Sequence, residues 1–243
     1  MIKIKIILFG LFFLYSCTPS QDKKILVATA SNFYQTVKDL AEKYNQIQKQ
    51  ETIQIIQGST GKLYAQIVQG APYSIFFSAD AKRVNLLSKQ KKGLDSMVYA
   101  IGKLSFCTHR QKLHSYDQLK KWLLAGKPIS IANPKVAPYG QAAVQVLQKL
   151  KLLPHRKTNV VYGNNVQQAF QFFITKAVQG TFISYSLVKS YPKKIPCYSN
   201  LEIMHDPIIQ KAILLKEQGK PFWKFLQTDS VKKIIQDYGY LVP

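Results

Sequence analysis

The stretch Gly58-Ser59-Thr60-Gly61-Lys62-Leu63-Tyr64-Ala65-Gln66-Ile67 is the most informative part of this chain. A β-rich run at 52–56 precedes it, and apolar residues at helical spacing follow its turn of glycines and hydroxyls. Such a turn presents free backbone N–H groups and neutral hydroxyl donors at the start of a helix, where the helix dipole favours an anion. The stretch therefore predicts a strand, an anion-binding turn and a helix.

A second turn of the same kind lies upstream. Residues 25–30 form an apolar run typical of a strand, Ser31 and Asn32 are good helix-capping residues, and a helical pattern starts at Phe33. Either turn alone could be an ordinary helix cap. Two of them in one chain favour the binding of an oxyanion.

The composition is that of a globular protein, with a large excess of positive charge. The chain has 243 residues and a formal net charge of +22. This charge suits nucleic acid, an anionic membrane surface or a small anion, and equally a lysine-rich solvated surface. From Gln118 to Leu201 there is no Asp or Glu but there are twelve Lys and Arg, so this span cannot supply a carboxylate for acid–base catalysis or for a hard metal ion.

The N-terminus indicates export. A basic start at 1–5 and an apolar run at 6–15 lead into Ser16 and Cys17, which predicts a signal peptide over 1–16. Residues 14–17 resemble a bacterial lipobox, so we expect lipidation of Cys17, with 17–24 as a tether. The expected location is the bacterial cell envelope, in the periplasm or on the outer face of the membrane.

Two further cysteines remain, Cys107 and Cys197. We expect two buried thiols, with a disulfide as the alternative in an oxidising compartment. The four histidines form no cluster in the sequence, so it contains no metal-binding motif.

Strand-like and helix-like segments alternate, which is the pattern of an α/β fold. Strands are predicted at 25–30, 52–57, 74–77, 104–108, 128–132, 159–162 and 181–185, with a strand-like pair around Pro207 within 202–215. Helices are predicted at 32–48, 60–69, 81–89, 116–124, 141–150, 166–178 and 221–238. The polar turns follow the ends of strands, where parallel sheets bind ligands.

Several of these segments, in this order and spacing, resemble the family of periplasmic molybdate-binding proteins of ABC transporters. The matching segments are 28–33, 58–67, 70–80, 132–140 and 163–169, and the resemblance extends from about Lys24 to Pro243. It implies the two-lobed type II periplasmic binding protein fold, an α/β fold. Each lobe would be a mostly parallel sheet flanked by helices, with the ligand in the cleft between the lobes. We expect lobe 1 to comprise 25–105 and 191–243, and lobe 2 to comprise 106–190.

The resemblance also implies a set of ligand-binding residues. Ser31 matches the first hydroxyl ligand. Thr60 matches the second, where the family usually has Ser, and Ser59 lies beside it. Tyr139 matches the ligand from the lobe 2 loop, and Val166 a backbone N–H ligand. The last ligand falls at Ser184 or Tyr185, with the register open by one residue, and Asn32 is a further candidate donor.

The implied function is that of a solute-binding lipoprotein of an ABC importer, which captures molybdate, and also tungstate, and delivers it to a permease and its ATPase. Molybdenum would be bound only as the oxyanion, with no cofactor. Another small oxyanion such as sulfate or phosphate is the alternative. We expect a monomer that binds no nucleic acid. We expect no enzymatic activity, because the chain lacks a nucleophile elbow and lacks paired carboxylates in its central span.

Overall fold

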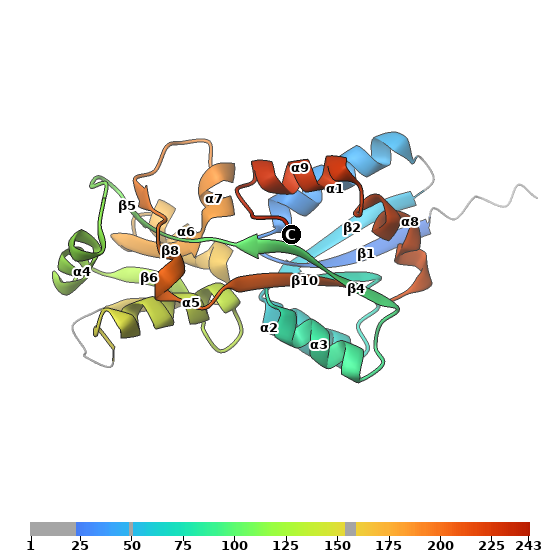
Figure 1. Cartoon of the computed structure of the whole chain (residues 1–243), viewed down its shortest axis with the longest axis horizontal. Coiled ribbons are helices and arrows are strands. Elements are labelled where there is room, and N and C mark those ends of the chain that lie inside the picture. The colour runs from blue at the N-terminus through green and yellow to red at the C-terminus, as the bar shows by residue number, and fades with distance from the viewer. Residues whose placement is uncertain (1–22, 49–50, 154–158) are drawn as a thin grey trace, which may run out of the picture.

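The computed structural model describes residues 23–48, 51–153 and 159–243. The predicted signal peptide, Cys17 and most of the tether lie outside these residues. The described chain forms two lobes, each built on a five-stranded sheet flanked by helices (Figure 1). Within the described residues, none of the helices has the length and apolar character needed to span a membrane.

The sheet of lobe 1 has the order β2-β1-β3-β10-β4. Its strands are β1 (Lys23–Ala30), β2 (Glu51–Gly58), β3 (Ile75–Ser78), β4 (Asp95–Gly102) and β10 (Ile208–Leu214). The first three are parallel, and β10 runs antiparallel to β3 and β4. The surrounding elements are α1 (Tyr34–Ile47), α2 (Thr60–Val68), α3 (Ala81–Lys89), η2 (Glu217–Gly219), α8 (Lys220–Phe225) and α9 (Asp229–Asp237).

Strand alternation divides the core of lobe 1 into two layers. Ile25 and Val27 of β1 pack in one cluster with side chains from α1, α8 and α9, and Ala28 packs in another with side chains from α2 and α3. Helices therefore cover both faces of the sheet (Figure 1). The parallel register pairs Ala30 with Gly58. Because parallel strands end at the same edge, the two polar turns that follow β1 and β2 become neighbours.

The sheet of lobe 2 has the order β7-β6-β8-β5-β9. Its strands are β5 (Leu104–Thr108), β6 (Ile129–Ala132), β7 (Val160–Gly163), β8 (Gly180–Ser184) and β9 (Cys197–Tyr198). Its helical elements are α4 (Tyr116–Leu124), α5 (Pro138–Lys149), α6 (Val166–Ile174), α7 (Tyr185–Ser190) and η1 (Glu202–Met204). The pairing of Ala132 with Gly163 places the turns after β6 and β7 side by side, as in lobe 1. Each sheet is mixed: four strands run in one direction, and one strand, β10 in lobe 1 and β5 in lobe 2, runs in the opposite direction.

The chain crosses between the lobes twice, first between β4 and β5 and then between β9 and β10 (Figure 1). These positions differ from the predicted boundaries. All of β5 belongs to the second sheet, so the first crossing comes before residue 105. The second comes after β9, because this strand pairs with β5 and stays with lobe 2. The prediction that the chain re-enters lobe 1 at residue 191 therefore places this boundary too early.

A disulfide joins Cys107 of β5 to Cys197 of β9, with a Cα–Cα distance of 4.1 Å. The prediction of two free buried thiols was therefore wrong, and the alternative of a disulfide is confirmed. The two cysteines are direct partners on adjacent antiparallel strands, a relationship that no local sequence pattern reveals. The bridge fastens the segment before the second crossing to lobe 2.

Other differences concern the ends of elements. The predicted helix 221–238 is two helices, α8 and α9, which allows Phe222 and Val231 both to reach the core of lobe 1. The helix predicted over 166–178 ends at Ile174, where Lys176 adopts a positive φ of 62°. Strand β4 was not predicted, because only part of its residues are buried and its apolar pattern is weak.

Candidate functional site

A small cavity lies between the lobes, where polar turns from both sheets meet. Its volume is about 10 Å³. The residues that line it are Ala30, Ser31, Asn32, Gly58, Ser59, Thr60, Ala79, Ala137, Pro138, Tyr139, Asn165 and Val166. Within the described part of the chain, none of these lining residues has a charged side chain.

The cavity is positive in character nevertheless, because helices begin around it. Its lining residues lie at or just before the starts of α1 and α2 in lobe 1 and of α5 and α6 in lobe 2. The first N–H groups of a helix have no partner within it, and the aligned peptide dipoles place a partial positive charge at this end. Four such ends facing one small space are suited to a small anion.

Ser59 and Thr60 have different roles at the start of α2. The Thr60 hydroxyl accepts a hydrogen bond from the backbone N–H of Ala79 at 3.1 Å, which ties α2 to the end of β3. The Ser59 hydroxyl is buried and has no hydrogen-bond partner. A buried hydroxyl without a partner is costly, so Ser59 Oγ is a donor available to a ligand in the cavity.

Ser31 and Asn32 contribute from the turn after β1. The Ser31 backbone N–H donates to the carbonyl of Gly58 at 3.0 Å, which locks the two turns of lobe 1 together. The Asn32 side-chain nitrogen donates to Gln210 Oε1 at 2.9 Å and to the Tyr240 hydroxyl at 3.1 Å. Both of its amide hydrogens are thus engaged within the protein, and the side chain of Asn32 supports the turn.

Lobe 2 contributes Tyr139 and Val166. The Tyr139 hydroxyl is buried and accepts a hydrogen bond from Gln210 Nε2 at 3.1 Å. Burial raises the pKa of Tyr139 well above its usual value, so the group stays a neutral donor at neutral pH. Val166 is the first residue of α6, so its N–H has no partner within the helix, while its side chain packs in the core.

Asn165 was not among the predicted site residues, although it lines the cavity. It caps α6, since its Oδ1 accepts from the N–H of Gln168 at 2.9 Å. The other missed lining residues contribute backbone or small side chains: Ala30, Gly58, Ala79, Ala137 and Pro138. The signals that could have found them are the capping role of Asn165 and, for Ala30 and Gly58, their place at the ends of the two strands before the polar turns.

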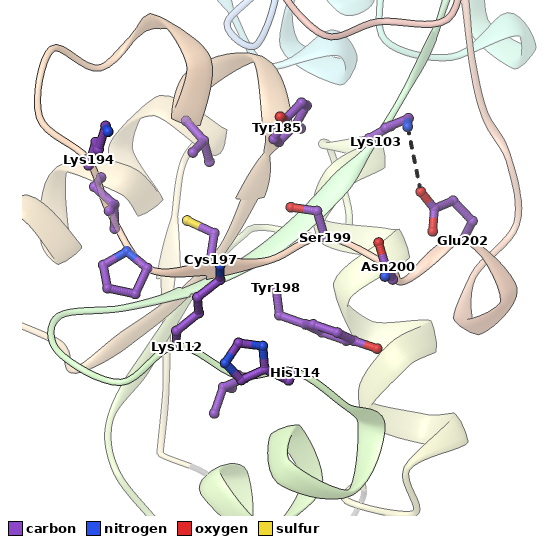
Figure 2. Close-up of a pocket in the computed structure, with 14 residues that line it drawn as sticks. Lys103, Lys112, His114, Tyr185, Lys194, Cys197, Tyr198, Ser199, Asn200 and Glu202 are labelled. Carbon is purple, nitrogen blue, oxygen red and sulfur yellow. Dashed lines mark ion pairs between the residues drawn. The ribbon is translucent and has the colours of Figure 1, made fainter.

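Ser184 and Tyr185, the two candidates for the last ligand, do not line this cavity. Ser184 is buried, and its hydroxyl oxygen lies 3.0 Å from Ser186 Oγ. Tyr185 lines a different and much larger pocket of about 770 Å³ beside β9. Figure 2 shows its side chain there, near Lys103 and Ser199.

This larger pocket is an open, basic depression rather than an enclosed site. Lys103, Lys112, His114 and Lys194 lie around it, and Lys103 Nζ is 4.0 Å from Glu202 Oε1 (Figure 2). Its lysines extend from separate segments, as is usual for a solvated surface. It lacks the converging helix starts that distinguish the small cavity.

The lobes touch around the small cavity. The N–H of Gly61 donates to the carbonyl of Val136 across the lobes at 2.8 Å. On the other side, Ser186 Oγ donates to the carbonyl of Asn32 at 3.0 Å and accepts from the Tyr240 hydroxyl at 2.8 Å. These contacts describe a closed arrangement.

The cavity does not suit a metal cation. Its lining residues include no carboxylate, imidazole or thiol, which are the usual side-chain ligands of cations. Elsewhere in the described residues, no group of three or more His, Cys, Asp or Glu side chains could hold a metal ion.

Comparison with known proteins agrees with this geometry. The family model of bacterial extracellular solute-binding proteins matches residues 25–241. The molybdate-binding protein ModA of Azotobacter vinelandii is 34% identical over 234 residues, which cover 91% of each chain. ModA of Rhodobacter capsulatus is 30% identical over 231 residues, which cover 92% of this chain and 90% of that protein.

A solved structure confirms the fold. The periplasmic molybdate-binding protein of Azotobacter vinelandii superimposes with a TM-score of 0.82 at 33% identity, covering 90% of this chain and 99% of that one. The chain therefore belongs to the bacterial extracellular solute-binding proteins, in the family that includes the molybdate-binding protein ModA of these bacteria.

Proposed function

We propose that this protein is the solute-binding component of an ABC importer and that it captures molybdate, and also tungstate, in the small cavity between its lobes. The observation that carries the proposal is the buried Ser59 hydroxyl, which has no partner and lies in a cavity formed by four helix starts. The molybdate-binding proteins to which the chain is similar support the choice of ligand.

The size and chemistry of the cavity favour a small dianion. Pockets for organic ligands commonly measure about 300–1,000 Å³, so a cavity of about 10 Å³ is far too small for them. Each hydrogen bond to a charged group contributes about 1.5–3 kcal/mol. Several neutral donors from Ser31, Ser59, Tyr139 and Val166 can therefore offset the cost of removing the anion from water. Ser184 and Tyr185 are weaker candidates, because neither lines the cavity.

Fixed donors can also select by the radius of the anion. A cavity matched to molybdate would leave a smaller anion with unmade hydrogen bonds, each of which costs about 1–3 kcal/mol. Sulfate or phosphate is the alternative ligand. The positive charge of the chain would raise the rate at which any such anion arrives, without setting the fit.

The N-terminal sequence supports attachment to the cell envelope through a lipid on Cys17. In this arrangement the protein is a monomeric lipoprotein that closes on its ligand and passes it to a permease and ATPase. It uses no cofactor, performs no catalysis and binds no nucleic acid. Growth with radiolabelled fatty acid would test the anchor: label should enter the chain and should be absent from a Cys17→Ser variant.

Isothermal titration of the mature chain with molybdate, tungstate, sulfate and phosphate tests the ligand. We expect strong heats with molybdate and tungstate and weak or absent heats with the other two. Tight binding of sulfate or phosphate without a response to molybdate would contradict the proposal. Ser88→Ala, which removes an exposed hydroxyl on α3, is the matched control for variants of the cavity serines.

A further inference from the structure

A buried glutamine outside the cavity connects the site residues of the two lobes. Gln210 lies on β10, just after the second crossing, and its side chain is fully buried. Its amide contacts Asn32 of lobe 1 and Tyr139 of lobe 2, and both of these residues line the cavity. Gln210 itself does not line the cavity, so any influence on a ligand must pass through its partners.

The hydrogen bonds of Gln210 fix which way its amide faces. Its Oε1 accepts from Asn32 Nδ2 at 2.9 Å and from the Tyr99 hydroxyl at 2.8 Å. Its Nε2 therefore faces Tyr139, whose hydroxyl oxygen lies 3.1 Å away. An amide nitrogen can only donate, so the Tyr139 oxygen must accept in this bond. The proton of Tyr139 is left for another acceptor.

Gly102 provides independent support, because it makes room for this hydrogen bond. It is the last residue of β4 and pairs with Ile208 of β10. A methyl group at this position would overlap the Tyr139 hydroxyl and crowd Gln210 Nε2. The hydrogen bond between Gln210 and Tyr139 thus lies against the backbone of β4, in a space that a side chain at position 102 would fill.

We propose that Gln210 is a positioning residue that sets the direction of the Tyr139 hydrogen bond to the ligand. Because Gln210 Nε2 donates to the Tyr139 oxygen, the Tyr139 hydroxyl can only donate to the bound anion. This inference rests on the proposed function and extends it to a ligand class. A Tyr139 hydroxyl that can only donate favours a fully deprotonated oxyanion at this position of the site. It disfavours an anion such as hydrogen phosphate, whose own O–H needs an acceptor.

A double-mutant cycle between Gln210→Met and Tyr139→Phe tests the inference, with anion affinities measured by titration calorimetry. We expect Tyr139→Phe to weaken molybdate binding about 10- to 100-fold. Gln210→Met should weaken it in the wild-type background but cause a smaller loss in the Tyr139→Phe background, where no hydroxyl is left to orient and only the contact with Asn32 is lost. An equal loss in both backgrounds, or no loss in either, would overturn the role of Gln210.

A second variant tests the same hydrogen bond without changing either of its side chains. Gly102→Ala removes neither partner but pushes the Tyr139 hydroxyl away from Gln210. It should also weaken binding, and by less in the Tyr139→Phe background; an equal loss in both backgrounds would count against the inference. Circular dichroism of each variant checks the fold.

The wild-type titration separates this inference from the proposed function. If sulfate binds in place of molybdate, the proposed ligand is wrong, and the cycle is judged with sulfate. Tight binding of phosphate would overturn the predicted preference for a fully deprotonated anion, and absence of binding for all four anions would overturn both proposals.

Discussion

The hydroxyl of Thr60 lies 3.1 Å from the backbone nitrogen of Ala79 and accepts its hydrogen bond. The contact links the first residue of α2 to the residue that follows β3, and both residues are buried. It leaves the adjacent Ser59 as the residue whose hydroxyl has no partner within the protein. Two neighbouring hydroxyls thus differ: that of Thr60 supports the turn, and that of Ser59 is the one we propose to bind the ligand.

Ser59→Ala should reduce ligand affinity without destabilising the free protein. Loss of one hydrogen bond to a charged ligand costs about 1.5–3 kcal/mol, or about 10- to 100-fold in affinity. The free protein loses no hydrogen bond, because this hydroxyl has none to lose. Calorimetric titration and urea unfolding without ligand would measure the two effects. A large loss of stability with unchanged affinity would contradict the assignment, and Ser88→Ala should change neither.

Thr60→Ala should have the opposite profile. Removal of the hydroxyl leaves the buried N–H of Ala79 without its partner, at a cost of about 1–3 kcal/mol in the free energy of unfolding. Thr60→Ser keeps the hydroxyl and should recover most of this stability. Urea unfolding of both variants is the measurement. If the two variants lose stability equally, the hydrogen bond to Ala79 is not the cause.

Stability should fall in alkaline solution because of buried tyrosines. Burial raises the pKa of Tyr99 and of Tyr139 above their usual value of about 10. Below about pH 9 these groups are neutral in both the folded and unfolded states, so they do not alter stability. As pH rises above about 10, the unfolded state releases protons that the folded state retains. Each tyrosine then lowers the free energy of unfolding by about 1.4 kcal/mol per pH unit until its folded-state pKa is reached.

Urea unfolding between pH 8 and 11 would measure this slope, with tyrosinate absorbance as a second signal. Tyr139→Phe should give a shallower slope than the wild type. Ligand affinity should stay flat between pH 7 and 9, because the proposed donors are neutral throughout. A steep fall of affinity in that range would indicate a charged lysine or histidine at the ligand.

Reduction of the Cys107–Cys197 disulfide should destabilise the protein. The bridge joins residues 90 positions apart, and a native disulfide that closes a long loop typically contributes about 2–5 kcal/mol. Thermal unfolding in a Cys17→Ser background, with and without reductant, measures the loss. The double variant Cys107→Ala, Cys197→Ala should start at the lower melting temperature and should not respond to reductant.

Local signals in the sequence pointed to several residues that line the candidate site. Glycine and hydroxyl turns between apolar strands and amphipathic helices indicated that Ser31, Ser59 and Thr60 precede helix starts, and these three residues do line one cavity with Tyr139 and Val166. These features depend on residues a few positions apart, so backbone propensity and periodicity are enough to predict them.

Other features depend on contacts between distant residues. Gln210 is 178 positions from Asn32 and 71 from Tyr139, yet it bonds to both, and no local pattern marks it. No local pattern reveals the strand register that places Cys197 opposite Cys107. Nor does one reveal that the side chain of Tyr185 lines a separate pocket.

The sequence by itself determined that neutral donors follow strand ends in both halves of the chain, because capping and turn chemistry are local. Only the tertiary structure decided which donors remain free: Ser59 Oγ is unpartnered, whereas Thr60 Oγ1 and Asn32 Nδ2 are engaged by Ala79, Gln210 and Tyr240. The physical reason is that a buried polar group must find a partner, and its partner is set by strand register and lobe packing rather than by its neighbours in sequence.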